Sequence, residues 1–302
     1  MQSGFIFDIK RYSINDGPGI RVTVFFKGCN LNCAWCHNPE SISHKVQKLY
    51  SENRCIRCKA CVDNCSEHVC ILTENGIVTN NKLCKLCGKC IQVCPTTATE
   101  FSGRNETSGN ILKIIEKELV FIDQSEGGVT FSGGEPLLQA EYLFELLDLC
   151  GRKGIHRAVD TAGYVKTDLL LEAARRTDLF LYDLKMIDPV LHKKWTGVNN
   201  ELILGNLQKL SEAGSNINIR IPLIAGVNDC EKNITQTAKF VLKLAGEKKK
   251  INILPYHNIA QQKYRKLGLE FNTQNLEEPS KENQSEIISI FESLGLEAVI
   301  GG

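Results

Sequence analysis

The chain has 302 residues, of which 42% are hydrophobic and 24% are charged, and its formal net charge at pH 7 is +1. These proportions are typical of a globular protein, and the length allows one large α/β core with a small insert. A charge near zero gives no general attraction to polyanions, so we expect no nucleic-acid or membrane partner. No apolar run approaches a signal peptide or the roughly 18 residues of a membrane-spanning helix, which predicts a cytoplasmic protein. A monomer is our default expectation.

Cysteine is the most informative residue type in the chain. Eleven of the 14 cysteines fall into three clusters, and the remaining three are Cys70, Cys150 and Cys230. In a reducing compartment, clustered cysteines indicate iron-sulfur or zinc sites, and disulfides are not expected. The three isolated cysteines are expected to be small hydrophobic core residues.

The first cluster follows an apolar run, residues 21–26, whose β-branched and aromatic residues predict a buried strand. Its spacing is C-x3-C-x2-C, with Cys29, Cys33 and Cys36 in one loop. Three thiolates can hold three corners of a four-iron cluster and leave the fourth iron open for chemistry, whereas an electron-carrying cluster is closed by four. A zinc knuckle, the alternative, would need C-x2-C pairs and a fourth ligand. His37 is poorly placed for that because it directly follows Cys36.

This unequal spacing, with the aromatic Trp35 before the third cysteine, resembles the signature of the radical S-adenosylmethionine (SAM) enzymes. The resemblance implies that Cys29, Cys33 and Cys36 bind a catalytic 4Fe-4S cluster whose open iron receives SAM. It also implies that Trp35 and His37 lie beside the adenosine.

Residues 13–21 precede the first strand and contain Asp-Gly and Pro-Gly pairs, which predict tight turns. The segment matches a phosphate-binding loop only weakly, because a third glycine and a following helix are missing. A plain turn is the simplest interpretation. However, DGPGIR just before the cysteine motif resembles the glycyl radical enzyme activases, which are radical SAM proteins that act on another protein. That resemblance implies contact with the partner enzyme by four residues: Asp16, Gly17, Gly19 and Arg21.

Residues 51–101 are rich in cysteine and contain no long periodic pattern. A C-x2-C-x2-C-x3-C run recurs after 29 residues, first as Cys55, Cys58, Cys61 and Cys65, then as Cys84, Cys87, Cys90 and Cys94. The pattern matches bacterial two-cluster ferredoxins, in which the last cysteine of each run binds the other cluster. This resemblance implies one 4Fe-4S cluster on Cys55, Cys58, Cys61 and Cys94, and another on Cys84, Cys87, Cys90 and Cys65. Ser66 replaces the proline expected after the first run, which puts the local turn in question. Two zinc ribbons would instead need paired C-x2-C knuckles.

From residue 102 onward, short apolar runs alternate with segments of helical periodicity. We expect strands at 128–132, 156–160, 179–185, 216–223 and 251–254, and helices at 110–121, 139–152, 167–176, 200–213, 230–246 and 280–294. Such alternation predicts βαβ units and a parallel sheet. With the resemblance, the predicted fold is α/β: a partial (β/α) TIM-like barrel of the radical SAM type. Residues 1–50 and 102–302 form it, and residues 51–101 are the inserted ferredoxin-like domain.

The segment 132–136, Ser-Gly-Gly-Glu-Pro, directly follows a predicted strand, and its glycines allow the backbone to approach a ligand closely. It resembles the GGEP motif of radical SAM enzymes. The resemblance implies that Gly133, Gly134 and Glu135 bind the amino-acid end of SAM.

Polar residues recur where other strands end, and in a barrel that edge carries the active site. By resemblance to the activases, Asp183, Leu184, Lys185, Arg220 and His257 would contact SAM. A monovalent cation near the SAM carboxylate would be bound by the carboxylates of Asp160 and Asp183 and the carbonyls of Thr161 and Leu181, since hard cations prefer oxygen. The alternative for each is a buried polar group that is satisfied within the protein. Residues 257–283 are long, polar and weakly periodic, which indicates a flap or a partner-binding loop.

The resemblance implies reductive cleavage of SAM to methionine and a 5′-deoxyadenosyl radical, which removes a hydrogen atom from a glycine Cα of a partner glycyl radical enzyme. Reduced ferredoxin or flavodoxin would supply electrons through the two insert clusters. Two alternatives stay open. One is a radical SAM enzyme acting on a small molecule or peptide. The other is a non-enzymatic electron carrier, against which the three-cysteine site and GGEP both argue.

Overall fold

A mostly parallel sheet of nine strands forms the main body of the protein. The computed structural model describes residues 1–247, 249–271 and 276–301. The strand order is β13-β12-β11-β10-β9-β8-β2-β1-β7. From β2 to β13 all neighbours are parallel, while β1 is antiparallel to β2 and β7. The strands are β1 (Ser3–Ser13), β2 (Arg21–Phe26), β7 (Arg104–Thr107), β8 (Gly128–Gly133), β9 (His156–Thr161), β10 (Leu179–Asp183), β11 (Ile217–Leu223), β12 (Lys250–Pro255) and β13 (Ala298–Ile300).

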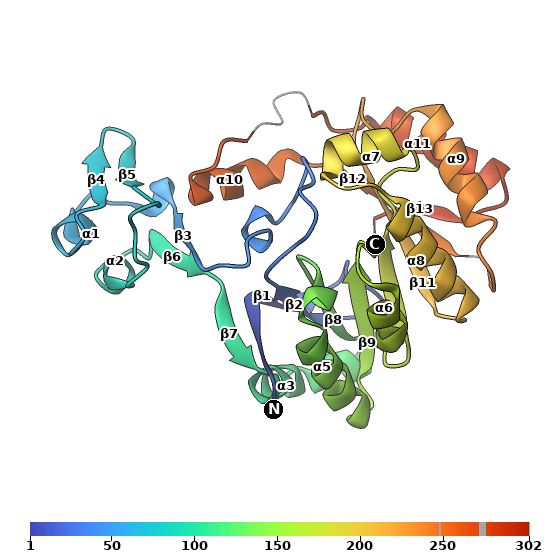
Figure 1. Ribbon diagram of the computed structural model, residues 1–302, viewed down its shortest axis with the longest axis horizontal. Coiled ribbons are helices and arrows are strands. Elements are labelled where there is room, and N and C mark those ends of the chain that lie inside the picture. The colour runs from blue at the N-terminus through green and yellow to red at the C-terminus, as the bar shows by residue number, and fades with distance from the viewer. Residues whose placement is uncertain (248, 272–275, 302) are drawn as a thin grey trace.

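Helices cover the outer face of this sheet (Figure 1). They include α3 (Ser108–Glu116), α4 (Leu119–Gln124), α5 (Ala140–Arg152), α6 (Thr167–Ala174), α8 (Glu201–Glu212), α9 (Glu231–Val241) and α11 (Lys281–Ser293). The core lies between the helices and the strands. In β11, for example, Ile217, Ile219, Ile221 and Leu223 are buried at alternate positions, as the period of a strand requires.

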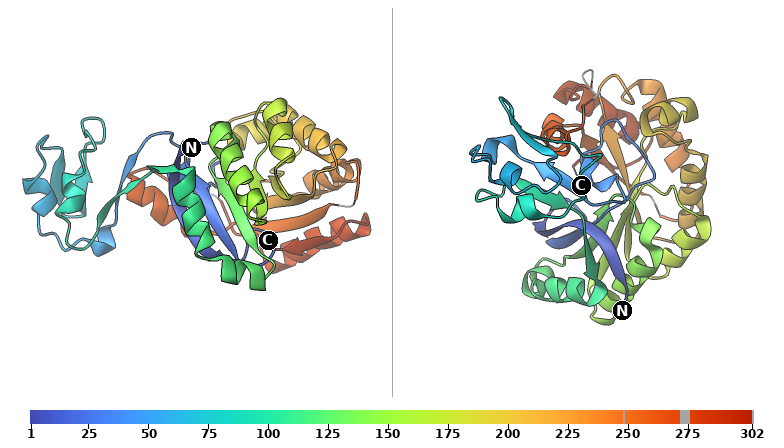
Figure 2. Two further views of the ribbon diagram at one scale, coloured as in Figure 1. Left: turned by 90° about the horizontal axis from the view of Figure 1, so that it is seen from below. Right: turned by 60° about the vertical axis from the view of Figure 1, so that its left-hand side comes forward.

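The sheet curves, so that its other face is concave (Figure 2). Arg220 on β11 reaches across β10 to Asp160 on β9, with 3.4 Å between Nη1 and Oδ2. Ser132 on β8 donates to the same carboxylate oxygen at 2.7 Å. The sheet therefore has helices on one side and hydrogen-bonded polar side chains on its concave side.

The cysteine-rich residues project away from the main sheet, at the left of Figure 1. A two-stranded stalk, β3 (Gln47–Tyr50) and β6 (Thr99–Ser102), connects them to it. Beyond the stalk lie the hairpin of β4 (Cys70–Thr73) and β5 (Gly76–Thr79) and two single-turn helices, α1 (Ala60–Asp63) and α2 (Lys89–Gln92).

Several elements differ from the sequence expectations. The helix expected at 110–121 is two helices, α3 and α4. The sequence did not predict strands β1, β7 and β13. In β1, buried and exposed residues do not alternate along the whole strand, because most of its outer half is exposed. Within 257–283, the structure contains α10 (Gln261–Leu267), while residues 272–275 lie outside the described part of the chain. Another unexpected helix, α7 (Pro189–Thr196), follows β10. No helix in the described residues is long and apolar enough to cross a bilayer.

The three isolated cysteines do not behave alike. Cys70 and Cys150 are buried, as predicted, and Cys150 belongs to the main core. The prediction for Cys230 is wrong, because this residue is exposed at the start of α9.

Arg21 corrects one interpretation of the DGPGIR segment. Its side chain is 0% exposed, so it does not contact a partner directly. The guanidinium instead donates to Thr130 Oγ1 (2.7 Å), Val129 O (2.6 Å) and Pro18 O (2.9 Å). Arg21 therefore fixes the turn at residues 16–19 against the start of β8.

Replacing Arg21 by methionine should lower the free energy of unfolding by about 3 kcal/mol, because buried acceptors lose a charged donor. Anaerobic urea denaturation measures this. The control is Arg152→Met, which removes an exposed arginine at the end of α5 and should leave the midpoint unchanged. Equal midpoints for the two variants would contradict the role given to Arg21.

Candidate functional site

The loop with the first three cysteines leaves the sheet at the C-terminal end of β2 and is fixed by backbone hydrogen bonds along its length. Cys29 N donates to Ile42 O at 3.1 Å, Asn32 N to Thr196 O at 2.8 Å, and Ala34 N to Trp195 O at 2.9 Å. Helix α7 thus holds the middle of the loop, and the chain after the motif holds its start. Such a loop can present several ligands in fixed positions.

Cys29, Cys33 and Cys36 lie near one another in a site shielded from water. Burial, with a smaller effect of the neighbouring thiols, raises the pKa of Cys29 to about 11 and that of Cys36 to about 12. Burial also raises the pKa of Cys33. Three thiols kept neutral by burial suit a cationic iron centre, which stabilises their thiolates. Among the described residues, no three His, Cys, Asp or Glu side chains could share one metal ion. A cluster does not require this, because each thiolate binds a different iron.

The GGEP segment packs directly against the start of the cysteine loop. Gly134 N donates to Phe26 O at 2.8 Å, and Glu135 N donates to Gly28 O at 2.9 Å. A Cβ on Gly134 would lie 2.1 Å from Gly28 O, and Gly133 has φ +114°. Only glycine allows this approach, so the two motifs seen in the sequence form one site in space.

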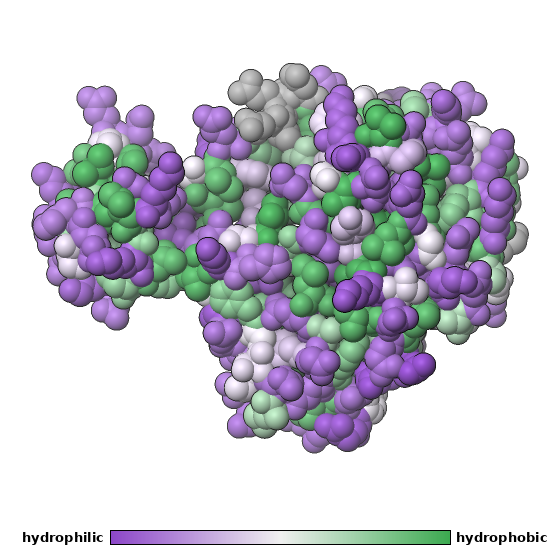
Figure 3. All heavy atoms as spheres, viewed as in Figure 1, coloured by the Kyte–Doolittle hydropathy of each residue, from purple (hydrophilic) through white to green (hydrophobic). Residues whose placement is uncertain are grey.

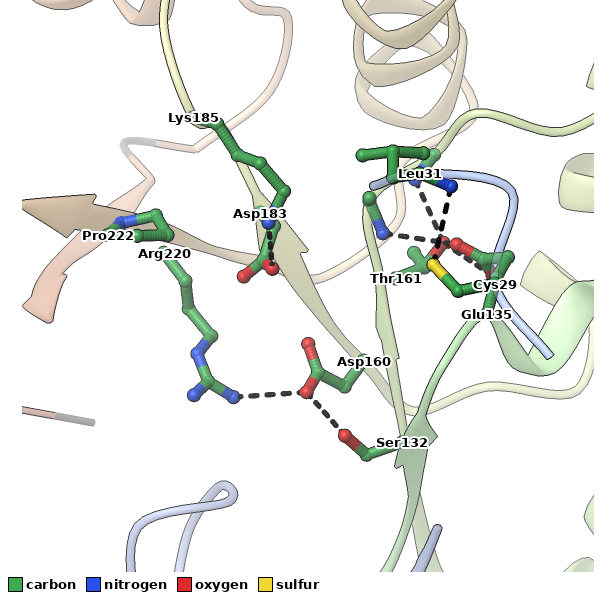
Figure 4. Close-up of polar contacts among 12 residues, drawn as sticks. Cys29, Leu31, Ser132, Glu135, Asp160, Thr161, Asp183, Lys185, Arg220 and Pro222 are labelled. Carbon is green, nitrogen blue, oxygen red and sulfur yellow. Dashed lines mark hydrogen bonds and ion pairs between the residues drawn. The ribbon is translucent and has the colours of Figure 1, made fainter. Parts of the chain in front are cut away.

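Glu135 is buried, and its carboxylate accepts several hydrogen bonds from within the protein (Figure 4). Thr161 Oγ1 donates to both oxygens at 2.9 and 2.8 Å, and the N–H groups of Leu137 and Ala162 each donate at 3.2 Å. Burial raises the pKa of Glu135 to about 7 despite these bonds. A carboxylate so oriented and so poorly solvated would gain strongly from a cationic ligand.

A second group of charges lies on the concave face (Figure 4). Lys185 Nζ is 2.7 Å from Asp183 Oδ2, and Arg220 pairs with Asp160. Burial raises the pKa of Asp160 to about 6, although Arg220 opposes this. Burial alone would lower the pKa of Lys185, but Asp183 and the thiols of Cys33 and Cys29 hold it above the ordinary value. Both carboxylates expected to bind a monovalent cation are therefore already paired with side-chain cations.

Trp35 lies in a small hydrophobic cluster with Met186, Ile224 and Tyr256 at the same edge. His37 Nε2 lies 3.2 Å from the backbone oxygen of His257. The His257 side chain itself is half exposed and faces Glu278, 3.6 Å away, so the structure does not direct it to the cysteines. Leu184 is buried, and its N–H donates to Arg220 O at 2.9 Å.

The turn at residues 16–19 lies at the opposite, N-terminal edge of β2. Asp16 accepts a hydrogen bond from Thr23 Oγ1 at 2.7 Å, and its backbone oxygen accepts from Thr130 Oγ1 at 2.6 Å. Its charge acts on Asp160 and Arg220, which places it on the concave side. Gly19 has φ +67° and approaches Gly127, where a Cβ would meet backbone at 2.6 Å. The turn and the cysteine loop thus lie at the two ends of the same concave face.

The insert contains two cavities whose lining cysteines exchange between the two runs. One cavity is lined by Cys55, Cys58, Cys61 and Cys94. A second is lined by Cys65, Cys84, Cys87 and Cys90, together with Cys70. Each set combines three cysteines of one run with the last cysteine of the other. Four thiols around each cavity fit a closed four-iron cluster.

The duplication seen in the sequence also holds for the backbone. Helices α1 and α2 are related by the same offset of 29 residues. Positive φ values recur in three pairs with that offset: Arg57 and Leu86, Lys59 and Gly88, and His68 and Thr97. The replacement of the expected proline by Ser66 therefore leaves the local backbone conformation the same in both runs. His68, which follows Cys65, and Thr97, which follows Cys94, both have a positive φ.

Sequence reasoning missed the residues that close the site from α7 and α10. Trp195 packs beside Trp35, and Lys263 binds the cysteine loop through Asn38 Oδ1 (2.6 Å) and Glu40 Oε1 (3.0 Å). Tyr264 lies near enough to Cys36 and Cys33 for their charges to raise its pKa, after burial as the main cause. Helix α10 is short and polar, so periodicity gave no signal for it.

Comparison with known proteins identifies the family. The model of the radical SAM superfamily matches residues 23–238. The chain belongs to this superfamily. It is 42% identical to the trans-4-hydroxy-L-proline dehydratase activating enzyme of Clostridioides difficile, over 98% of this chain and 99% of that protein. It is also 42% identical to the choline trimethylamine-lyase activating enzyme of Oleidesulfovibrio alaskensis, over 89% of each.

Among solved structures, this radical SAM protein is similar to a domain of a pyruvate-formate lyase-activating enzyme from Bacteroides vulgatus. The identity is 43% and the TM-score 0.51, and the match covers 58% of this chain and 99% of that domain. The relatives are thus activating enzymes within the superfamily, which agrees with the resemblance of the DGPGIR segment.

Replacing Gly134 by alanine should weaken SAM binding by the anaerobic holoenzyme at least about tenfold, because the new Cβ displaces GGEP from the cysteine loop. Equilibrium dialysis with labelled SAM measures this. Gly205→Ala is the control, since Gly205 lies in α8 with nothing within 4 Å of its Cβ position. Wild-type affinity in the Gly134 variant would contradict the close-approach argument.

Proposed function

We infer that this protein is a glycyl radical enzyme activating enzyme. The observation that carries this inference is the contact between the GGEP segment and the start of the three-cysteine loop, in a chain related along nearly its whole length to activating enzymes. When bound, the cluster supplies the electron that cleaves SAM, and the resulting 5′-deoxyadenosyl radical takes a hydrogen atom from a glycine Cα of the partner. The chain's own residues bind, orient and shield these groups.

Cys29, Cys33 and Cys36 would hold the catalytic 4Fe-4S cluster. Gly133, Gly134 and Glu135 would bind the amino group of SAM, supported by the oriented and poorly solvated Glu135 carboxylate. Trp35 and His37 would lie beside the adenosine, and the cations of Lys185 and Arg220 would face the SAM carboxylate. Asp183 would position Lys185, while Leu184 would contact SAM through its backbone.

A monovalent cation on Asp160, Thr161, Leu181 and Asp183 stays a secondary proposal. Asp160 and Asp183 use Oδ2 for their pairs with Arg220 and Lys185, so Oδ1 of each carboxylate is outside those pairs. His257 would take part only through its backbone contact with His37.

The glycine-bearing segment of the partner would enter the concave hollow between the turn at residues 16–19 and the cysteine loop. Support comes from the position of Asp16, Gly17 and Gly19 at the opening, with polar side chains lining the hollow. Arg21 acts there by fixing the turn. The hollow's curvature agrees with the predicted partial (β/α) barrel formed by residues 1–50 and 102–302.

Residues 51–101 would form a ferredoxin-like domain with two further 4Fe-4S clusters. Each of the two cavities is lined by four thiols in the exchanged pattern that such domains use. The clusters would carry electrons from a reduced ferredoxin or flavodoxin toward the catalytic cluster.

A donor would dock beside the insert. A cleft of about 790 Å³ lies between the insert and α10, lined by four basic residues, Arg54, Arg57, Arg265 and Lys266, by the buried Lys48, and by one acidic residue, Glu52. Exposed apolar side chains also gather on the insert (Figure 3), including Ile56, Ile71, Val78 and Leu83. Basic charge around an apolar surface would steer and bind an acidic electron carrier.

The activity is tested by mixing the reconstituted, dithionite-reduced protein with SAM and purified candidate glycyl radical enzymes under anaerobic conditions. We expect 5′-deoxyadenosine and a doublet in the electron paramagnetic resonance (EPR) spectrum of one candidate. A control partner with its radical glycine replaced by alanine should give no doublet. If 5′-deoxyadenosine forms and no candidate gains a radical, the protein-substrate claim fails and action on a small molecule or peptide gains support.

A further inference from the structure

A single lysine of the stalk is buried beside one of the two insert cavities. Lys48 on β3 is only 7% exposed. Its Nζ donates to Thr79 Oγ1 at 2.8 Å and to Cys70 Sγ at 3.3 Å. Two hydrogen bonds to β4 and β5 fix the ammonium group in one place, because both partners lie on the hairpin that faces the stalk.

The ammonium group lies next to the second cysteine set. Lys48 lines the cavity of Cys65, Cys84, Cys87 and Cys90. The ammonium group, held by Cys70 and Thr79, therefore lies at the edge of the space where a cluster would sit.

The first cavity has a different neighbour at the corresponding place on the strand. Two residues along β3, on the same face, Tyr50 lines the cavity of Cys55, Cys58, Cys61 and Cys94. Its hydroxyl accepts a hydrogen bond from Ile77 N at 3.0 Å. Lys59, Lys85 and Lys89 also border the cavities, but all three are exposed, where water screens their charges. The strand therefore gives one cavity a buried cation and the other a neutral phenol.

We propose that Lys48 makes the cluster on Cys65, Cys84, Cys87 and Cys90 the more easily reduced of the two insert clusters. The inference rests on the proposed function, in which the insert binds both clusters. Reduction adds one negative charge to a cluster, and a fixed cation in a poorly solvated site stabilises that charge. An electron delivered to the insert then resides mainly on the second cluster before it moves to the catalytic site. Lys48 acts on the cluster through its charge and is not one of its ligands.

The test is an EPR-monitored redox titration of the full-length holoenzyme and of Lys48→Met, which removes the charge but retains a chain of similar length. The signal that changes on addition of SAM marks the catalytic cluster, and the remaining two midpoints belong to the insert. We expect one insert midpoint to fall by at least the equivalent of a tenfold change in the ratio of reduced to oxidised cluster, about 59 mV for one electron. The other insert midpoint should fall less, because Lys48 also acts on Cys61 of the first set, and the catalytic midpoint should stay in place.

Three further variants make the result specific. Lys48→Arg keeps the charge and should restore most of the midpoint. Lys82→Met removes an exposed lysine of the same insert and should change nothing. Lys48→Gln retains a donor for Thr79 and replaces the methionine variant if that variant loses iron.

Iron and sulfide analysis separates the possible failures. Unchanged midpoints in a neutral variant that retains all its iron would overturn the role of Lys48 while leaving the proposed function intact. If both neutral variants lost the second cluster, Lys48 would be needed for the assembly of that cluster, and this result would also overturn the proposal. If the wild-type protein contained only enough iron for the catalytic cluster, the proposal that the insert binds two clusters would be refuted.

Discussion

The close approach of two backbone segments, Gly133–Glu135 at the end of β8 and Phe26–Gly28 at the end of β2, is the constraint on which the rest of the site depends. Neighbouring parallel strands lie a fixed distance apart, so the loops that leave them meet only where side chains are absent. The two glycines allow Gly28 O to accept from Glu135 N. One loop carries the thiols and the other carries the carboxylate, and this contact sets the distance between them.

Buried charge on the concave face follows from the same arrangement. Asp160, Asp183, Lys185 and Arg220 lie where strands end, in a hollow that water reaches poorly. Removing such groups from water is costly, and each is stabilised by a partner of opposite charge. The paired groups form a preorganised polar surface for a zwitterionic ligand. Binding can therefore use charges whose positions are fixed before the ligand arrives.

The sequence predicted the central part of the fold well because its signals are local. Strands β2, β8, β9, β10, β11 and β12 are short apolar runs, and the parallel sheet follows from their alternation with amphipathic helices. The spacing of the cysteines also predicted the two sets that the structure brings together around the cavities of the insert. Strand β1 and helix α10 gave no such signal, because one is largely exposed and the other is short and polar. The burial of Arg21 could not be predicted either, since it depends on Val129 and Thr130, more than 100 residues away in sequence.

The central claim is that the radical formed at the three-cysteine site reaches a glycine of another protein. The most direct measurement uses a partner glycyl radical enzyme made with glycine deuterated at Cα. The account predicts that 5′-deoxyadenosine released during activation carries one deuterium, transferred from that glycine. Unlabelled 5′-deoxyadenosine, formed at the same rate with or without the partner, would contradict it.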